Sequence, residues 1–204
     1  MSNLQEILSS PHSPPEEGGV RPEPIILYLG ESGFDNPYGF LIFRTTYGDD
    51  EKWEQFMAYL KAQAKRGLED GGDSHQFERI DWNVISSPDL DGASVDHVRE
   101  KFRQWIASGD EPPDNSGRFR ACIGVDSDSL DSVMDMLEIL EEEDEPLDSF
   151  DDTALAYVDL VSINEREDYV PMCISYLYPR AFDIVCDPGW EFVQPSKGNY
   201  VATP

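Results

Sequence analysis

Alternating and periodic runs of apolar residues divide most of the chain into strands and helices. The segment 38–47 reads Tyr-Gly-Phe-Leu-Ile-Phe-Arg-Thr-Thr-Tyr, and its β-branched and aromatic side chains predict a strand. Residues 77–85, 119–125 and 154–163 predict three further strands on the same grounds. The first, third and fourth of these strands are apolar on both faces, so we expect both faces of their sheet to be covered.

Three segments between these strands show the spacing of amphipathic helices, namely 49–67, 94–109 and 126–140. Each begins with a serine or aspartate, whose oxygen can accept a hydrogen bond from a free N–H of the first turn. The first two end at a glycine, which favours a helix stop. Their apolar stripes are Trp53, Phe56, Met57, Leu60 and Ala64; Val95, Val98, Phe102, Trp105 and Ile106; and Leu130, Val133, Met134, Leu137 and Leu140.

The order of these elements predicts an α+β fold with a ferredoxin-like βαββαβ core, an inserted helix and a C-terminal wrapping segment. In that core the first and fourth strands are neighbours, and helices cover only one face of the sheet. We therefore expect the second face to be covered by the inserted helix 94–107, by the segment 166–204, or by a second subunit in a homodimer. A late strand is expected near 191–193.

The chain has 204 residues, which suits a single domain with a sizeable core. Residues 1–24 are rich in Pro, Ser, Glu and Gly and lack a periodic apolar face, which predicts a flexible N-terminal tail. We expect residues 25–204 to form one α+β domain, with its core at 38–163 and a C-terminal extension at 166–204.

The net charge of −27, from 42 acidic and 15 basic residues, is concentrated in one region. Residues 121–165 contain 15 acidic residues and no Lys, Arg or His. Because binding to nucleic-acid phosphates depends on Lys and Arg, that activity is not expected. A basic protein fits the surface 126–152 better. Its most acidic part consists of Glu141, Glu142, Glu143, Asp144 and Glu145.

The sequence favours the cytoplasm, with the nucleus left open. It contains no run of about 18 apolar residues that could span a membrane, and we expect no membrane association. The first 17 residues lack the basic and apolar parts of a secretory signal. Cys122, Cys173 and Cys186 are odd in number and widely spaced, which favours free thiols.

Two charged residues interrupt otherwise apolar strands, namely Arg44 and Asp159. A buried charge is costly unless it is paired. The structural interpretation is an ion pair between Arg44 and Asp159, on neighbouring strands of a ferredoxin-like sheet, or exposure at a sheet edge. The functional interpretation is a ligand site formed by Arg44, Tyr47, Tyr157 and Asp159, in which the guanidinium holds a carboxylate or phosphate and the two tyrosines complete the pocket.

Motifs for catalysis, metals and cofactors are weak. Outside the predicted tail only His75 and His97 could act as imidazole bases or ligands. The acidic segments 126–130 and 89–100 both lack the glycine of an EF-hand loop. Neither a phosphate-binding glycine loop nor a G-x-S-x-G motif occurs. We therefore expect no metal, no cofactor and no catalytic residues.

The run Tyr38-Gly-Phe-Leu-Ile-Phe-Arg-Thr-Thr-Tyr-Gly-Asp-Asp, followed by Trp53 and Phe56, resembles the opening of a family of small acidic proteins from filamentous ascomycete fungi. In that family a strand ending in Arg-x-x-Tyr leads into an acidic cap and a Trp-bearing helix. The resemblance covers mainly residues 38–66 and implies a fungal source. The family is uncharacterised, so the resemblance implies no function.

These observations lead to a main hypothesis and two alternatives. The main hypothesis is a non-enzymatic interaction or regulatory protein that uses the acidic surface 126–152. The first alternative is a small-molecule-binding protein or cofactor-free enzyme with a pocket on the open sheet face around Arg44. The second is an acidic mimic of nucleic acid that occupies a basic site.

Overall fold

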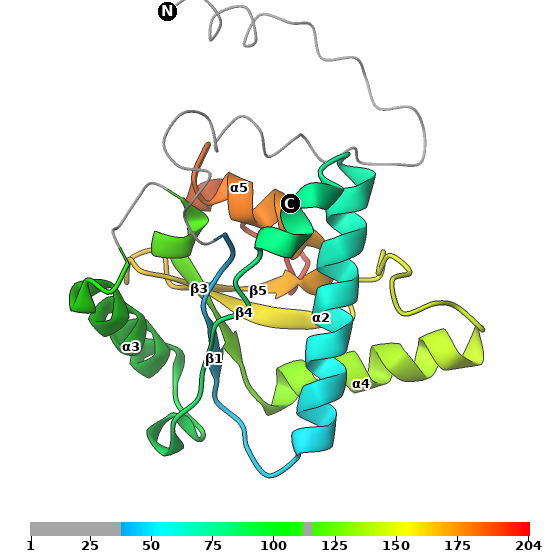
Figure 1. Cartoon of the computed structure of the whole chain (residues 1–204), viewed down its shortest axis with the longest axis horizontal. Helices are drawn as coiled ribbons and strands as arrows, with labels where there is room; N and C mark the ends of the chain where they lie inside the picture. The colour runs from blue at the N-terminus through cyan, green and yellow to red at the C-terminus, as the bar shows by residue number, and fades with distance from the viewer. Residues whose placement is uncertain (1–37, 112–115) are drawn as a thin grey trace, which may run out of the picture.

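A five-stranded sheet forms the centre of the computed structural model, which describes residues 38–111 and 116–204 (Figure 1). The predicted tail 1–24 lies outside the described residues. The strand order is β2-β1-β3-β4-β5. Strand β1 is parallel to both β2 and β3, whereas β3, β4 and β5 follow one another in antiparallel fashion. The strands are β1 (Ile42–Arg44), β2 (Val84–Ile85), β3 (Ala121–Val125), β4 (Tyr157–Ser162) and β5 (Tyr169–Cys173).

The fold is mixed α+β, but the strand order differs from that of a ferredoxin-like sheet. The fourth predicted strand, β4, pairs with β3 and not with β1. The second, β2, is parallel to β1, because helix α2 separates them and carries the chain back across the sheet. As in a ferredoxin-like sheet, β1 and β3 are neighbours, but they are parallel here, whereas neighbouring strands of a ferredoxin-like sheet are antiparallel.

Helices cover both faces of the sheet (Figure 1). Helices α2 (Asp50–Asp70) and α4 (Ser127–Glu142) pack on one face, in a core that includes Phe40, Ile42 and Ile123. Helix α3 (Val95–Ser108) packs on the other face, against a smaller cluster that includes Leu41 and Phe43. Of the three coverings considered from the sequence, the inserted helix is the one that lies on the second face.

All three predicted helices are confirmed, together with the residues that cap them. Asp49, Ser94 and Asp126 each accept a hydrogen bond from the backbone N–H three residues later, at 3.0, 3.4 and 2.9 Å. These bonds satisfy donors that have no partner inside the helix. Gly109 ends α3 in a left-handed conformation, as a C-terminal glycine commonly does.

Helix α2 runs past Gly67, where the sequence predicted its end, and stops at Asp70 with Gly71 as the cap. Gly67 serves a different purpose. A Cβ atom on it would lie 2.2 Å from the carbonyl oxygen of Tyr178, so the missing side chain lets the C-terminal segment approach the helix backbone.

Two strand predictions are wrong in part or in whole. Residues 77–85 were expected to form one strand, but Ser74–Arg79 is a 3₁₀ helix and only β2 is extended. The late strand expected near 191–193 is the 3₁₀ helix Trp190–Phe192. The C-terminal segment instead supplies β5, and Ala202 adds a parallel bridge to its edge.

Short helical turns make up most of the remaining regular structure. Residues 174–184 form a continuous series of them that packs into the main core. The turns are Pro88–Leu90, Gly117–Phe119, Ile174–Tyr176, Leu177–Ala181 and α5 (Phe182–Ile184). No helix within 38–111 or 116–204 is long and apolar enough to cross a membrane.

Candidate functional site

The Arg44 guanidinium makes its contacts within its own part of the fold. It donates to the Thr46 carbonyl oxygen and to Asp50, both at 2.8 Å. It also lies over the rings of Tyr47 and Trp53, at 4.9 and 4.7 Å from their centroids. The Arg44 side chain therefore fastens the end of β1 to the start of α2, and the expected ion pair with Asp159 is absent.

The Tyr47 hydroxyl is likewise used inside the fold. It lies 2.9 Å from the carbonyl oxygen of Arg44 and 3.0 Å from that of Ser87, and it accepts a bond from the Ser87 amide at 2.9 Å. These contacts hold the segment after β2 beside the end of β1.

The four predicted ligand residues do not form one pocket. Arg44 shares its face of β1 with Ile42, which packs in the α2 and α4 core. Asp159 alternates with Val158 and Leu160 of that same core, so its side chain and that of Tyr157 point to the opposite face. The structure keeps the pairs Arg44–Tyr47 and Tyr157–Asp159 but places them on different sides of the sheet.

A group of tyrosines surrounds Asp159 on that opposite face. Within β4, Tyr157 lies two residues before Asp159 and therefore on the same face. Across the β4–β5 ladder, Tyr169 is opposite Val161, which places it diagonally next to Asp159. Tyr200 of the C-terminal segment meets the Tyr157 ring edge to face, with centroids 6.1 Å apart and an interplanar angle of 87°.

Burial and neighbouring charge shift the protonation of this group. Burial, followed by the charges of Asp126 and Asp128, raises the pKa of Asp159 to about 7. Burial raises the pKa of Tyr157 to about 12, with a further contribution from Tyr200. The pKa of Tyr169 is raised chiefly by Asp159. Asp159 is among the charges that raise the pKa of both Tyr157 and Tyr169, which places these three side chains close to one another.

Sequence reasoning missed Tyr169 and Tyr200 because it assigned no strand to residues 166–173. A usable signal was present: Tyr169, Pro171 and Cys173 alternate with Val170 and Met172. The position of Tyr200 depends on the bridge between Ala202 and β5, which no local pattern predicts.

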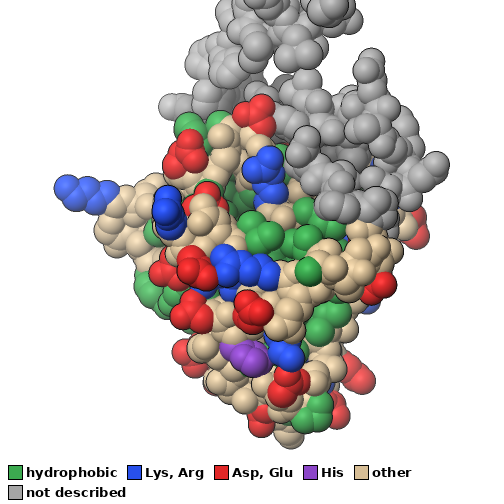
Figure 2. Space-filling model, turned by 90° about the vertical axis from the view of Figure 1, so that its left-hand side faces the viewer, with side chains coloured by type: hydrophobic (Ala, Val, Ile, Leu, Met, Phe, Trp, Pro, Cys, Tyr) green, Lys and Arg blue, Asp and Glu red, His purple; other side chains and the backbone are tan. Residues whose placement is uncertain are grey.

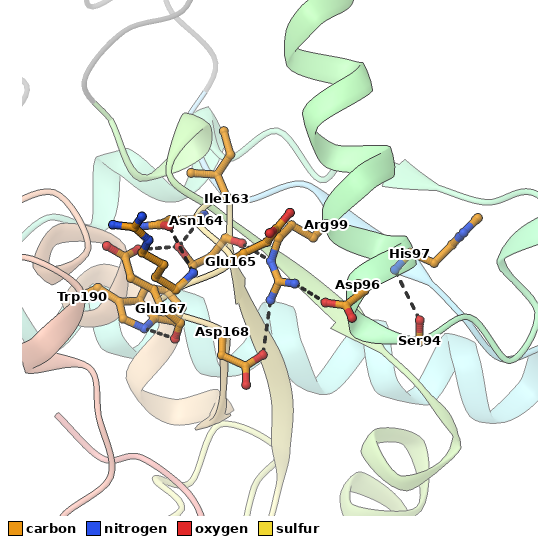
Figure 3. A network of polar contacts seen from close by, with 12 residues as sticks. Ser94, Asp96, His97, Arg99, Ile163, Asn164, Glu165, Glu167, Asp168 and Trp190 are labelled. Carbon is orange, nitrogen blue, oxygen red and sulfur yellow. Dashed lines mark hydrogen bonds and ion pairs between the residues drawn. The ribbon is translucent and has the colours of Figure 1, made fainter.

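Helix α3 fixes the turn that leads into Tyr169 (Figure 3). The buried Arg99 guanidinium donates to the Ser162 carbonyl oxygen at 2.9 Å and contacts the carboxylates of Asp96 and Asp168. Arg103 donates twice to the Ile163 carbonyl oxygen, at 3.0 and 2.7 Å. These bonds hold both ends of the β4–β5 turn, including Asp168, whose φ of 60° is strained for a residue other than glycine.

The same turn is closed by contacts between its own residues and the C-terminal segment. The Ser162 hydroxyl donates to Glu167 at 2.5 Å, and the Trp190 indole N–H donates to the Glu167 carbonyl oxygen at 2.8 Å (Figure 3). All of the polar groups in this network are used to hold the turn, so we assign it a positioning role.

The predicted acidic surface 126–152 lies along α4 and the segment after it. Asp128, Asp131, Asp135, Glu138 and Glu142 are spaced three or four residues apart, and all five are exposed. They form one stripe along the helix, and Glu141, Glu143, Asp144 and Glu145 extend it. Among these acids only Asp131 has a described basic partner, Lys52 at 2.7 Å.

The face that carries α3 has a different charge pattern. Basic and acidic side chains lie close together there (Figure 2). Lys101 bonds Asp89 at 2.5 Å, and Arg103 bonds Glu165 at 2.6 Å. Opposite charges offset one another on this face, so α4 carries the largest uncompensated negative charge of the described surface.

Large apolar side chains are exposed beside the acidic stripe. Ile139 near the end of α4 is 37% exposed, and Leu147 and Phe150 in the following segment are 40% and 47% exposed. The Phe150 ring rests edge to face on Tyr176, at 5.3 Å between centroids. The acidic surface therefore contains apolar contact points as well as charge.

The described residues contain no cluster of three His, Cys, Asp or Glu side chains suited to a metal ion. His97 lies 3.9 Å from Asp89 at the surface. Burial raises the pKa of the Cys173 thiol to about 12, which disfavours a thiolate nucleophile there.

Comparisons with known proteins add no identification: no protein-family model, no curated protein and no solved structure matches the chain. The resemblance to fungal proteins over residues 38–66 stays a prediction.

Proposed function

We propose that this chain is a non-enzymatic interaction protein whose acidic surface 126–152 binds a basic segment of a partner protein. The observation that carries the proposal is the exposed stripe of acids on α4, in which Lys52 is the only basic partner among the described residues. Such a stripe concentrates negative potential along a line about 24 Å long, the length of a 16-residue helix.

The exposed apolar side chains narrow the class of partner. Charge on a surface chiefly speeds association and selects partners, whereas buried apolar contacts extend the lifetime of a complex. Ile139, Leu147 and Phe150 provide such contacts next to the stripe. A basic amphipathic segment, with Lys or Arg on one side and large apolar residues on the other, matches both features.

The alternative of a ligand pocket around Arg44 has less support. Two protein oxygens and two aromatic rings already occupy the Arg44 guanidinium. A ligand carboxylate would have to displace Asp50, and no observation favours that exchange.

Affinity capture with the full chain tests the proposal. In the test variant, Glu141, Glu142, Glu143 and Glu145 become Gln and Asp144 becomes Asn. A control variant also removes five negative charges, by Glu→Gln and Asp→Asn changes at exposed acids elsewhere, namely Glu78, Asp91, Glu100, Asp110 and Glu191. Captured proteins are identified by mass spectrometry, and their direct binding is then measured.

We expect the test variant to lose basic partners that the control variant keeps. Equal losses in both variants would mean that net charge alone attracts the basic partners. Unchanged capture by the test variant would contradict the proposal. Triple substitution of Ile139, Leu147 and Phe150 by Ser should raise the dissociation rate of the partner more than it lowers the association rate.

A further inference from the structure

Three tyrosines lie near Asp159 on one face of the sheet. Tyr157 and Tyr169 flank the Asp159 carboxylate along and across β4, and Tyr200 stands perpendicular to Tyr157. Directly opposite Asp159 in β3 is Gly124, which adds no side chain to this face. From this geometry we propose that the cluster of Tyr157, Asp159, Tyr169 and Tyr200 binds a trimethylammonium group.

The rings are accessible to such a group. Tyr200 is 68% exposed and Tyr169 36% exposed, while Tyr157 and Asp159 are half-buried. Asp159 lies outside the apolar cluster beneath α3, and part of its surface is exposed. An incoming cation can therefore meet ring surface and a carboxylate without moving a core side chain.

The electrostatics favour a positive ligand. The charged groups that act on Asp159 are Asp126 and Asp128, both negative, and the Asp159 carboxylate receives no hydrogen bond from the described residues. Attraction between a cation and the face of an aromatic ring adds to this field. Above about pH 7, where Asp159 is ionised, an anion would meet repulsion from three carboxylates.

A bulky organic cation fits better than a metal ion. Metal ions of the Ca²⁺ and Mg²⁺ type require several oxygen ligands at short range, and the described residues offer no cluster of three candidate ligands. A trimethylammonium group donates no strong hydrogen bond, so it needs ring surface and a diffuse negative field. Both are present around Asp159.

The cluster adjoins the proposed docking surface. Asp126 is the N-cap of α4, and Asp128 is the first acid of the stripe. A basic segment lying along α4 could therefore place a trimethyllysine against Tyr200. This step deepens the proposed function and rests on it, whereas binding of a free trimethylammonium compound does not.

Titration of the full chain with tetramethylammonium chloride tests the site. Sodium chloride at equal ionic strength is the reference, and the tyrosine ring resonances are followed by NMR. We expect saturable shifts with tetramethylammonium and none with sodium. Identical responses to the two salts would show that only the diffuse negative charge acts, and would overturn the proposal.

Variants assign the binding to particular side chains. Tyr200→Ala should weaken tetramethylammonium binding about tenfold, and Tyr200→Phe, which keeps the ring, by no more than about twofold. Asp159→Asn should weaken it as well. Phe192→Ala removes another exposed ring of the C-terminal segment, 54% exposed, and should leave binding unchanged. Loss of binding in Phe192→Ala, or full binding in Tyr200→Ala, contradicts the assignment.

Two further ligands separate the sources of the trimethylammonium group. Choline represents a small molecule, and a basic peptide carrying one trimethyllysine represents a protein. We expect the peptide to bind at least tenfold more tightly than choline and than the same peptide with an unmodified lysine. If the two peptides bind equally and tetramethylammonium does not bind, the proposal of an acidic docking surface is supported and the proposal of a cation site is contradicted. If tetramethylammonium and choline bind but neither peptide does, the site stands and the docking proposal fails.

Discussion

At the scale of single residues, the buried Arg118 and the half-buried Asp159 differ in how well the fold satisfies their hydrogen-bonding groups. The buried Arg118 guanidinium bonds the Gly39 carbonyl oxygen at 2.9 Å and the carboxylates of Asp81 and Glu111 at 2.6–2.7 Å. Its position within the fold satisfies its hydrogen-bonding groups. Asp159 has no such partner among the described residues, and a half-buried carboxylate without one gains most from pairing with a ligand cation.

The raised pKa of Asp159 predicts an unusual pH dependence of stability. The folded chain holds this proton up to about pH 7, whereas the unfolded chain releases it near the ordinary value of 3.8. The contribution of Asp159 to the free energy of unfolding is therefore greatest at low pH and is lost as the pH rises from about 4 to about 7. The groups acting on Asp159 are Asp126 and Asp128.

Replacing this carboxyl by a neutral amide should remove that dependence. We expect Asp159→Asn to raise the free energy of unfolding by about 2 kcal/mol at pH 8 and to change it little at pH 4. Urea denaturation at both pH values measures this difference. Asp135→Asn, at an exposed position of α4, controls for the general loss of one negative charge. Equal effects of the two substitutions at pH 8 would contradict the prediction.

At the scale of elements, the C-terminal segment is fixed by several separate contacts. The Tyr178 ring packs in the main core, and its hydroxyl oxygen accepts a hydrogen bond from the Phe40 amide at 2.9 Å. Its carbonyl oxygen approaches α2 at Gly67. The Trp190 indole holds the β4–β5 turn, and Ala202 extends β5 at its edge. The segment therefore positions both Tyr169 and Tyr200.

The contact at Gly67 gives a test of this packing. In an exposed helix, Gly→Ala stabilises by about 1 kcal/mol. Here the new Cβ would overlap the Tyr178 carbonyl oxygen, so Gly67→Ala should instead lower the free energy of unfolding by about 2 kcal/mol. Urea denaturation of wild type and variant measures the sign of this change in the free energy of unfolding. A more stable variant would show that the C-terminal segment does not pack closely against α2.

At the scale of the whole molecule, charge is divided unevenly. The α3 face pairs its ions, whereas α4 and the segment after it carry acids with almost no counter-charge. A net charge of −27 opposes compaction through self-repulsion. The acidic surface thus carries a cost in stability, which supports the view that it serves a purpose other than folding.

Salt should reduce that cost. Raising NaCl from about 10 mM to about 500 mM shortens the Debye length from about 30 Å to a few ångströms, and should raise the free energy of unfolding by about 1 kcal/mol. Urea midpoints in the two buffers measure this shift. The variant with residues 141–145 neutralised should respond less, and an equal response would place the repulsion elsewhere in the chain.

Much of the secondary structure could be predicted because it depends on local patterns. The stripes of α2, α3 and α4, their caps, and the two-sided apolar strands β1, β3 and β4 were all legible from residue spacing. Only part of the candidate site could be predicted from the sequence. Asp159 and Tyr157 were identified because a charge in an apolar strand is unusual, but Arg44 was assigned to the same pocket on the assumption of a ferredoxin-like strand order.

The sequence by itself determined the element types, the helix caps and the position of the acidic surface, because these depend on residues close together in the chain. Tertiary structure decided the strand order, and with it the face on which each side chain lies. Strand pairing depends on contacts between distant residues, and the β3–β4 pairing separates Asp159 from Arg44. Packing of the C-terminal segment then brought Tyr169 and Tyr200 to Asp159, since β5 and the bridge at Ala202 form only when the rest of the sheet is in place.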